Sequence, residues 1–324
     1  MNRLTFLLSL KDRPRYSTIW LDHNIRPEYD YLVADGSISG ENEALFKDLR
    51  LPNLTYLRFQ KDLSIDCYVE KMLQAASQIK TRYVMACDND DFINFQGVNS
   101  CIVALEQTPE AVCAGGPICG VMQSESPVFG TRYSLPIHGM DTSALDGRTG
   151  FDGLKALFSN YIPLWYQIFR TDKYRAIWQD IKLLQISDVF LIETLQAQLA
   201  LCHGKNLQLK ANHYVRLANP QTSTARESAI SHGPHTDKIY FDDAYRQQVL
   251  RMSGHVASLA GVELPLLLNE LKNYYLSSIP REKSICTRIT NLATRIRSVF
   301  ARKLAAVFSI EFGIRWINFR CRIS

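Results

Sequence analysis

The chain has 324 residues, of which 46% are hydrophobic and 21% are charged, a composition that is ordinary for a globular protein. The formal net charge is +5, but residues 281–324 carry a net +8, which leaves −3 for residues 1–280. The basic character therefore belongs to the C-terminus, and the length allows one main domain with an appendage. No stretch reaches the ~20 apolar residues that a membrane-spanning helix needs.

The eight cysteines form no Cys-x-x-Cys pair and show no zinc-ligand spacing. Free thiols of this kind indicate a reducing compartment, and we expect a cytoplasmic location. The N-terminal apolar run before Lys11 is too short for a signal peptide, and no small-residue cleavage site follows it. We interpret this run as a buried first strand.

Short apolar runs alternate with amphipathic segments in the first half of the chain, which predicts strand–helix units around a parallel sheet. The expected strands are 4–10, 29–34, 54–59, 83–87 and 111–114, with a helix over 65–79. Residues 115–150 are expected to form a long loop or small excursion. A strand at 165–170, a helix at 188–203 closed by Gly204, a strand at 207–211 and a loop at 217–237 follow.

The strongest chemical signal is the acidic stretch Asp88-Asn89-Asp90-Asp91, which directly follows an apolar strand. Three carboxylates within four residues repel one another. A hard divalent cation such as Mg²⁺ or Mn²⁺ relieves this repulsion, and carboxylate oxygens suit it as ligands. The stretch predicts a metal site that a nucleotide diphosphate would complete; the alternative is an acidic turn that caps the next helix.

A weaker signal is Asp35-Gly36-Ser37 at the end of the second expected strand. An aspartate in this position can accept hydrogen bonds from a base or a ribose, and Gly36 is expected to let the backbone turn sharply. Asp-Gly is also a common turn, so this motif alone is weak evidence for nucleotide binding.

Four stretches together resemble the family-2-like glycosyltransferases with the A-type nucleotide-sugar fold, particularly a bacterial branch that acts on surface polysaccharides. They are residues 7–14, 35–37, 81–92 and 165–170. The resemblance covers residues 1–215, and the acidic stretch is its specific part. It implies an α/β fold, with one Rossmann-like domain around a mostly parallel central sheet and a C-terminal helical extension.

The resemblance also implies a metal site. The Asp-x-Asp motif of this fold falls on Asp88-Asn89-Asp90 or, one step later, on Asn89-Asp90-Asp91. Asp90 belongs to both registers and is the firmest ligand, with Asp88 and Asp91 beside it. Mn²⁺ or Mg²⁺ is the implied cofactor.

A nucleotide-diphosphate-sugar donor is implied as the partner of this metal. Asp35 resembles the nucleoside-binding aspartate of the family, and Asp66 either reaches the base or caps the helix after the third strand. Asp88 and Arg13 are expected to lie at the donor, and Arg216 is a candidate clamp for its phosphates. Histidines near Arg216, at positions 213, 232 and 235, are weaker candidates for a metal ligand.

An inverting transferase needs a carboxylate that takes the proton of the acceptor hydroxyl. In the family that this chain resembles, the base lies at the start of a helix beyond the metal motif, and Asp188 is the matching candidate. The family's paired acidic motif is not matched cleanly, because Val189 follows Asp188. Asp180 and Glu193 therefore remain alternatives, and Asp188 also fits a simple helix cap.

Residues 281–324 combine an apolar stripe at helical spacing with Arg288, Arg295 and Arg302 on one flank and with Trp316 among arginines. This pattern predicts a basic amphipathic tail on an anionic membrane surface, at the inner face of the cytoplasmic membrane. The alternative is a helix that packs on the main domain or on a second subunit. Nucleic acid is not expected as a partner, because the cations follow an apolar stripe and not aromatic stacking platforms.

The expected organisation is a nucleotide-sugar-binding catalytic domain over 1–215, a lid or acceptor-side segment with helices over 216–280, and the tail. The expected activity is metal-dependent transfer of a sugar to a glycan or a lipid-linked acceptor. Two rivals remain. A nucleotidyltransferase shares the layered fold, but its Gly-rich basic loop is missing after the first strand. A catalytically inactive assembly partner is disfavoured by the intact acidic stretch.

Overall fold

The structure is a computed structural model that describes residues 2–126, 130–133, 137–140, 142–159, 161, 163–217 and 236–277. Residues Met1–Ser278 form one compact unit, and the second unit, Ile279–Ser324, lies outside the described residues. The expectations for the tail and for His232 and His235 therefore fall outside the description. Among the described helices, none is long and apolar enough to cross a membrane.

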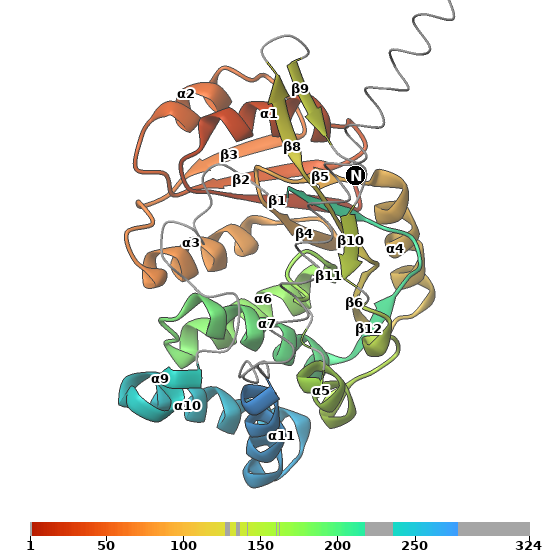
Figure 1. The fold of residues 1–324 in the computed structure, drawn as a ribbon. Coiled ribbons are helices and arrows are strands. Elements are labelled where there is room, and N and C mark those ends of the chain that lie inside the picture. Colours follow the sequence, from red (N-terminus) through yellow and green to blue (C-terminus); the bar gives the residue numbers. More distant parts are fainter. Residues whose placement is uncertain are drawn as a thin grey trace, which may run out of the picture. The chain divides into compact units, whose positions relative to one another are not determined.

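The described elements alternate between strands and helices along most of the chain (Figure 1). The strands are β1 (Leu4–Leu10), β2 (Asp30–Asp35), β3 (Leu54–Arg58), β4 (Tyr83–Cys87), β5 (Phe92–Ile93), β6 (Ala111–Gly115), β7 (Ile118–Val121), β8 (Gln123–Ser126), β9 (Gly130–Tyr133), β10 (Ile137–Met140), β11 (Ile168–Arg170), β12 (Lys205–Gln208) and β13 (Tyr214–Leu217). The helices are α1 (Pro14–Asn24), α2 (Glu41–Lys47), α3 (Ile65–Gln78), α4 (Phe95–Gln107), the 3₁₀ helix η1 (Ser143–Leu145), α5 (Gly150–Ser159), α6 (Thr171–Leu184), α7 (Val189–His203), α9 (Thr236–Phe241), α10 (Asp243–Ala260) and α11 (Leu264–Ser277).

The central sheet has seven strands in the order β12-β6-β11-β4-β1-β2-β3. All neighbouring pairs are parallel except those of β11, which runs antiparallel to both β4 and β6. The carboxyl ends of β1, β2 and β4 therefore share one edge of the sheet with the amino end of β11. Ligands of open α/β sheets bind at this edge.

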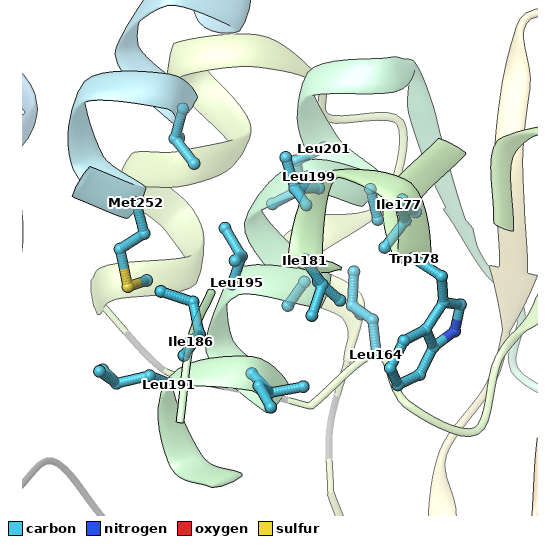
Figure 2. Close-up of a cluster of buried hydrophobic side chains, with 14 of the residues drawn as sticks. Leu164, Ile177, Trp178, Ile181, Ile186, Leu191, Leu195, Leu199, Leu201 and Met252 are labelled. Atoms are coloured by element: carbon cyan, nitrogen blue, oxygen red, sulfur yellow. The ribbon is translucent and has the colours of Figure 1, made fainter. Parts of the chain in front are cut away.

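Both faces of the sheet are covered, so central strands such as β1 and β4 are apolar on both sides. In β1, Leu7 packs with α3, α6 and α7, whereas Phe6 and Leu8 pack with α1, α2 and α4. Figure 2 shows the first of these cores. Trp178 of α6 and Leu195 of α7 belong to the same buried cluster as Met252 of α10. This continuous apolar character explains why the sequence predicted β1 and β4 with their observed bounds.

The segment after β6 was expected to be a loop or small excursion and contains four short strands. β7 and β10 join β13 and β5 in a second, four-stranded sheet, and β8 pairs with β9. These strands are too short and too rich in glycine and serine to show a local period. Their long-range pairing decides the structure, and the loop expectation was wrong for them.

The helices expected at 65–79 and 188–203 are confirmed as α3 and α7, and Gly204 closes α7 with a φ of 155°. The strand expected at 165–170 is shorter, because only Ile168–Arg170 pair with β4 and β6. The strand expected at 207–211 lies earlier in the chain, at Lys205–Gln208. The expected domain boundary at 215–216 falls inside β13.

Gly97, in the first turn of α4, offers a test of how the second sheet is held against the main domain. A Cβ at this position would lie 1.9 Å from the carbonyl oxygen of Asn212, just before β13. Gly97→Ala should therefore lower the free energy of unfolding by about 1–3 kcal/mol, measured by urea denaturation.

Gly254 is a matched control, because it also lies in a helix, α10, and a Cβ there would meet nothing within 4 Å. Gly254→Ala should raise the free energy of unfolding by about 0.5–1 kcal/mol, since alanine is the better helix former. Equal effects of the two substitutions would contradict the packing argument.

Candidate active site

Three carboxylates gather immediately after β4, at the ligand-binding edge of the sheet. One oxygen from each of Asp88, Asp90 and Asp91 lies within 4.8 Å of the others. Asp91 is only 3% exposed, and its Oδ1 accepts a hydrogen bond of 2.9 Å from the backbone N–H of Leu217 in β13. Asp88 is more open, and its Oδ2 accepts a hydrogen bond of 2.6 Å from the hydroxyl of Tyr166.

Burial raises the proton affinity of Asp90 and Asp91. Burial and the neighbouring Asp88 raise the pKa of Asp90, although Arg13 opposes the shift. Burial, followed by the charges of Asp90 and Asp88, holds the pKa of Asp91 well above its ordinary value. Both shifts show that negative charge is costly here and that additional positive charge would be stabilised.

The donor set suits a divalent metal ion. The carboxylates supply hard oxygen ligands of the kind that Mg²⁺ and Mn²⁺ take. In addition, Oδ2 of Asp91 is buried and has no hydrogen-bond partner in the described structure. A cation beside these acids would relieve both the repulsion and this unsatisfied oxygen.

Arg13 lies opposite the acids, in the turn between β1 and α1. Its Nη1 is 2.7 Å from Oδ2 of Asp90, and its Nη2 is 3.4 Å from Oδ1. The backbone of Asp12 and Arg13 is left-handed, with φ near 58° and 57°. The side-chain amide of Asn89 fixes this turn, because it donates to the carbonyl oxygen of Arg13 (3.1 Å) and to Oγ of Ser17 (2.9 Å).

Asp35, at the end of β2, is fully buried and has partners for both carboxylate oxygens. Oδ1 accepts from the backbone N–H of Ser37 (2.8 Å), and Oδ2 accepts from the hydroxyl of Tyr56 (2.6 Å). Nη1 of Arg58, at the end of β3, lies 2.8 Å from the same Oδ2. The nucleoside-binding role of Asp35 stays a prediction, and its present contacts orient Arg58 and Tyr56.

Gly36 is required for a reason that differs from the expected one. Its φ is not positive, but a Cβ there would lie 2.4 Å from the carboxylate of Asp62. Asp62 is buried in an ion pair with Lys71 of α3, whose ammonium also donates to the carbonyl oxygen of Leu10 (3.0 Å). The glycine therefore makes room for a buried ion pair behind the strand ends, and the expectation of a sharp turn was wrong.

Arg216 of β13 lies on the other side of the acids. Its Nε is 3.8 Å from Oδ2 of Asp91, and its guanidinium lies 5.2 Å from the centre of the Tyr166 ring. Tyr166 in turn stacks on Tyr214 at 4.4 Å between ring centres. The Arg216 side chain is 44% exposed, so it borders the site and remains accessible.

His213 is a structural residue and not a metal ligand. Its Nδ1 accepts from the backbone N–H of Gly116 (3.0 Å), and its Nε2–H donates to the carbonyl oxygen of Tyr166 (3.0 Å). Burial lowers the pKa of His213 to about 4, so the ring is neutral at pH 7. Both ring nitrogens are committed to the backbone.

The three candidates for the catalytic base occupy different surroundings. Asp188 is the N-cap of α7: its Oδ1 accepts from the N–H of Leu191 (3.2 Å), and its Oδ2 lies 3.0 Å from Nζ of Lys238. Glu193, one turn later, accepts from the hydroxyl of Tyr161 (2.9 Å).

Asp180 lies between two histidines, with Nε2 of His203 at 3.7 Å and Nε2 of His255 at 3.3 Å. Asp66 is exposed in the first turn of α3. The N-cap of that helix is Ser64, whose Oγ accepts from the N–H of Cys67 (3.3 Å), so the capping role considered for Asp66 was wrong.

Several residues that shape this site were not predicted from the sequence. Tyr166 lies in a stretch that carried the resemblance, but it was read only as part of a strand. Arg58 is the last residue of β3 at the same sheet edge, and this position at a strand end was the signal that could have found it. Tyr214 and Asn89 act through hydrogen bonds to distant segments and leave no local pattern.

No protein-family model matches the sequence, and no curated protein matches it either. Solved structures do match the fold. The structure of S. aureus TarS 1–349 in complex with UDP-GlcNAc superimposes with a TM-score of 0.59 at 14% identity, over 86% of this chain and 73% of TarS 1–349. The same protein in complex with UDP gives a TM-score of 0.51 at 14% identity, over 85% of this chain and 89% of the other. The predicted α/β A-type fold, with its mostly parallel sheet and C-terminal helices, is thereby confirmed, and the resemblance stated from the sequence holds at the level of the fold.

Proposed function

We propose that this protein is a metal-dependent glycosyltransferase that moves a sugar from a uridine-diphosphate-sugar donor to a hydroxyl group of a glycan or lipid-linked acceptor. The observation that carries the proposal is the cluster of Asp88, Asp90 and Asp91 at the strand-end edge of this fold, between two arginines. A protein with the same fold, TarS, has been crystallised with UDP-GlcNAc and with UDP, which supports the choice of donor.

Each residue of the site has a proposed role that follows from its position. Asp88 and Asp90 would hold Mn²⁺ or Mg²⁺, which offsets negative charge on the leaving diphosphate when it is bound. Tyr166 orients Asp88 through its 2.6 Å hydrogen bond, and Asp91 anchors β13 to the acidic turn. Arg216 borders the site and is suited to bind phosphate oxygens.

Asp188 is the proposed base. It takes the proton of the acceptor hydroxyl while the acceptor oxygen attacks the anomeric carbon. The bond from that carbon to the diphosphate breaks, the nucleotide diphosphate leaves, and the configuration inverts.

The direction of α7 supports Asp188 over Asp180. Because α7 leads through Gly204 into the amino end of β12, its last residue, His203, lies toward the amino edge of the parallel strands. Asp180 contacts His203 and therefore belongs to that edge. Asp188 begins the helix and so lies toward the opposite edge, where the acidic cluster is.

The acceptor and the location are proposed from the sequence of the tail. Residues 281–324 carry a net charge of +8 and an apolar stripe, which suits reversible attachment to an anionic membrane. A peripheral position at the inner face of the cytoplasmic membrane would bring the site close to a lipid-linked acceptor.

Asp90→Asn should remove metal-dependent nucleotide binding. The amide keeps the shape of the side chain but is a poor ligand, so the Kd for UDP in the presence of Mn²⁺ should rise by about 10–100-fold or more. Isothermal titration with and without EDTA measures this change. Asp172→Asn, at an exposed acid of α6, is the matched control and should bind as the wild type does. Unchanged binding by Asp90→Asn, with no effect of EDTA, would refute the metal site.

Asp188→Asn should lower kcat for transfer by at least about 100-fold and leave the KM for the donor nearly unchanged. Asparagine still caps α7, so the melting temperature should stay close to that of the wild type. Asp180→Asn and Glu193→Gln, assayed in parallel, are the comparison variants. A normal kcat for Asp188→Asn with a large loss in one of these would move the base to that residue.

Replacing Arg288, Arg295 and Arg302 together by glutamine should weaken binding to anionic vesicles by about 100-fold, because each basic residue contributes about 1 kcal/mol at such a surface. Cosedimentation with phosphatidylserine vesicles measures this loss, and added salt should mimic it. The control replaces three exposed basic residues of the main domain, Arg3, Lys47 and Lys155, by glutamine. Equal binding by the two triple variants would count against the membrane role of the tail.

A further inference from the structure

The guanidinium of Arg13 forms an ion pair with the carboxylate of Asp90, which is a proposed metal ligand. Both oxygens of Asp90 face it, at 2.7 Å and 3.4 Å, in a site where the Asp90 side chain is only 10% exposed and the Arg13 side chain 17%. Asp88 and Asp91 also stabilise the charge of Arg13. Among the described residues, Arg13 is the counter-ion of Asp90.

The charges of the cluster give a physical reason for the Arg13–Asp90 pair to separate when ligands bind. Among the described residues, the three carboxylates carry −3 and Arg13 and Arg216 together carry +2, so one negative charge is left over. A divalent cation reverses this sign and repels the guanidinium that shares Asp90 with it. A diphosphate adds at least two negative charges beside the cation and offers oxygens that match the fork of an arginine.

We propose that Arg13 is an exchangeable counter-ion, which pairs with Asp90 before ligands bind and moves to the diphosphate of the donor when a divalent cation takes its place. This inference rests on the proposed function, because it requires that the site binds a cation and a nucleotide diphosphate. Arg13 then competes with the metal for Asp90 when no nucleotide is present. When metal and nucleotide are both present, it strengthens nucleotide binding.

The backbone of Arg13 is built to stay in place while its side chain moves. Asn89 holds its carbonyl oxygen, and Pro14 follows it at the start of α1. Ser37 and Asn42 fix the preceding residue, Asp12. The backbone N–H of Asp12 donates to Oγ of Ser37 (2.7 Å), and its carbonyl oxygen accepts from the side-chain amide of Asn42 (2.8 Å). Only the side-chain torsions of Arg13 have to change.

Arg216 differs from Arg13 in this respect. Its closest carboxylate is Asp91, at 3.8 Å, and its guanidinium lies over the ring of Tyr166. It does not cover the oxygens of Asp90, so the entry of a cation there does not displace it. The exchange is therefore specific to Arg13.

The test uses Arg13→Gln in the full-length protein and two separate titrations. In the first, Mn²⁺ alone is added and free Mn²⁺ is followed by its electron paramagnetic resonance signal. The Kd for Mn²⁺ should fall by about 3–10-fold, because a competing cation has been removed. In the second, UDP is titrated at saturating Mn²⁺, and its Kd should rise by about 10-fold, because a phosphate contact is lost.

Two further variants make the result specific. Arg13→Lys keeps the charge but not the fork, so its Kd for Mn²⁺ should stay near that of the wild type while its Kd for UDP rises. Arg3→Gln removes one positive charge at an exposed pair with Glu106 and should change neither constant. Melting curves of all variants check that they are folded. If Arg13→Gln is not folded, the UDP titration of Arg13→Lys serves as the test.

Opposite shifts of the two constants in Arg13→Gln support the exchange. Weaker binding of both ligands, or no change in the Mn²⁺ titration, overturns it and leaves Arg13 a fixed contact. If the wild type binds Mn²⁺ but no nucleotide, the proposed function fails, and the Mn²⁺ titration alone then decides whether Arg13 competes with the cation. Failure of both wild type and Arg13→Gln to bind Mn²⁺ overturns the exchange as well.

Discussion

The mutual repulsion of three carboxylates in a partly buried turn is the constraint on which the rest of this site depends. Asp88, Asp90 and Asp91 lie within a few ångströms of one another, and burial raises the pKa of Asp90 and Asp91. Such a cluster persists only if donors and cations surround it. The chain supplies them from separate places: Arg13 after β1, Tyr166 before β11, and Arg216 with the Leu217 amide in β13.

The topology of the sheets makes this convergence possible. Parallel strands place the turns after β1, β2 and β4 at one edge, and the single reversed strand, β11, brings its amino end and Tyr166 to the same edge. The small second sheet adds β13 beside β5, which directly follows the acidic turn. Gly97 permits the close approach of the segment before β13. The short strands after β6, which show no clear pattern in the sequence, therefore help to build the wall of the site.

How much the sequence revealed follows from where the determining contacts lie. Strands β1 and β4 are apolar on both faces, and helix α3 has a regular apolar period, so local pattern was enough to predict them. The acidic stretch was also visible, because its members are adjacent. By contrast, the hydroxyl of Tyr166 reaches Asp88 across 78 positions, and the hydroxyl of Tyr214 reaches the Asp88 amide across 126. Contacts at such separations depend on the completed fold and have no local signature.

The asparagine within the acidic stretch bears on the register of the metal motif, which the sequence left open. Asn89 is only 2% exposed, and its amide donates to the carbonyl oxygen of Arg13 and to Oγ of Ser17. An aspartate could not donate these bonds and would add a fourth negative charge against a carbonyl oxygen. Asn89 therefore points away from any ligand and into the turn that carries Arg13. The role of Asn89 therefore favours Asp88 and Asp90, which flank it, as the proposed metal ligands, with Asn89 fixing the arginine that faces Asp90.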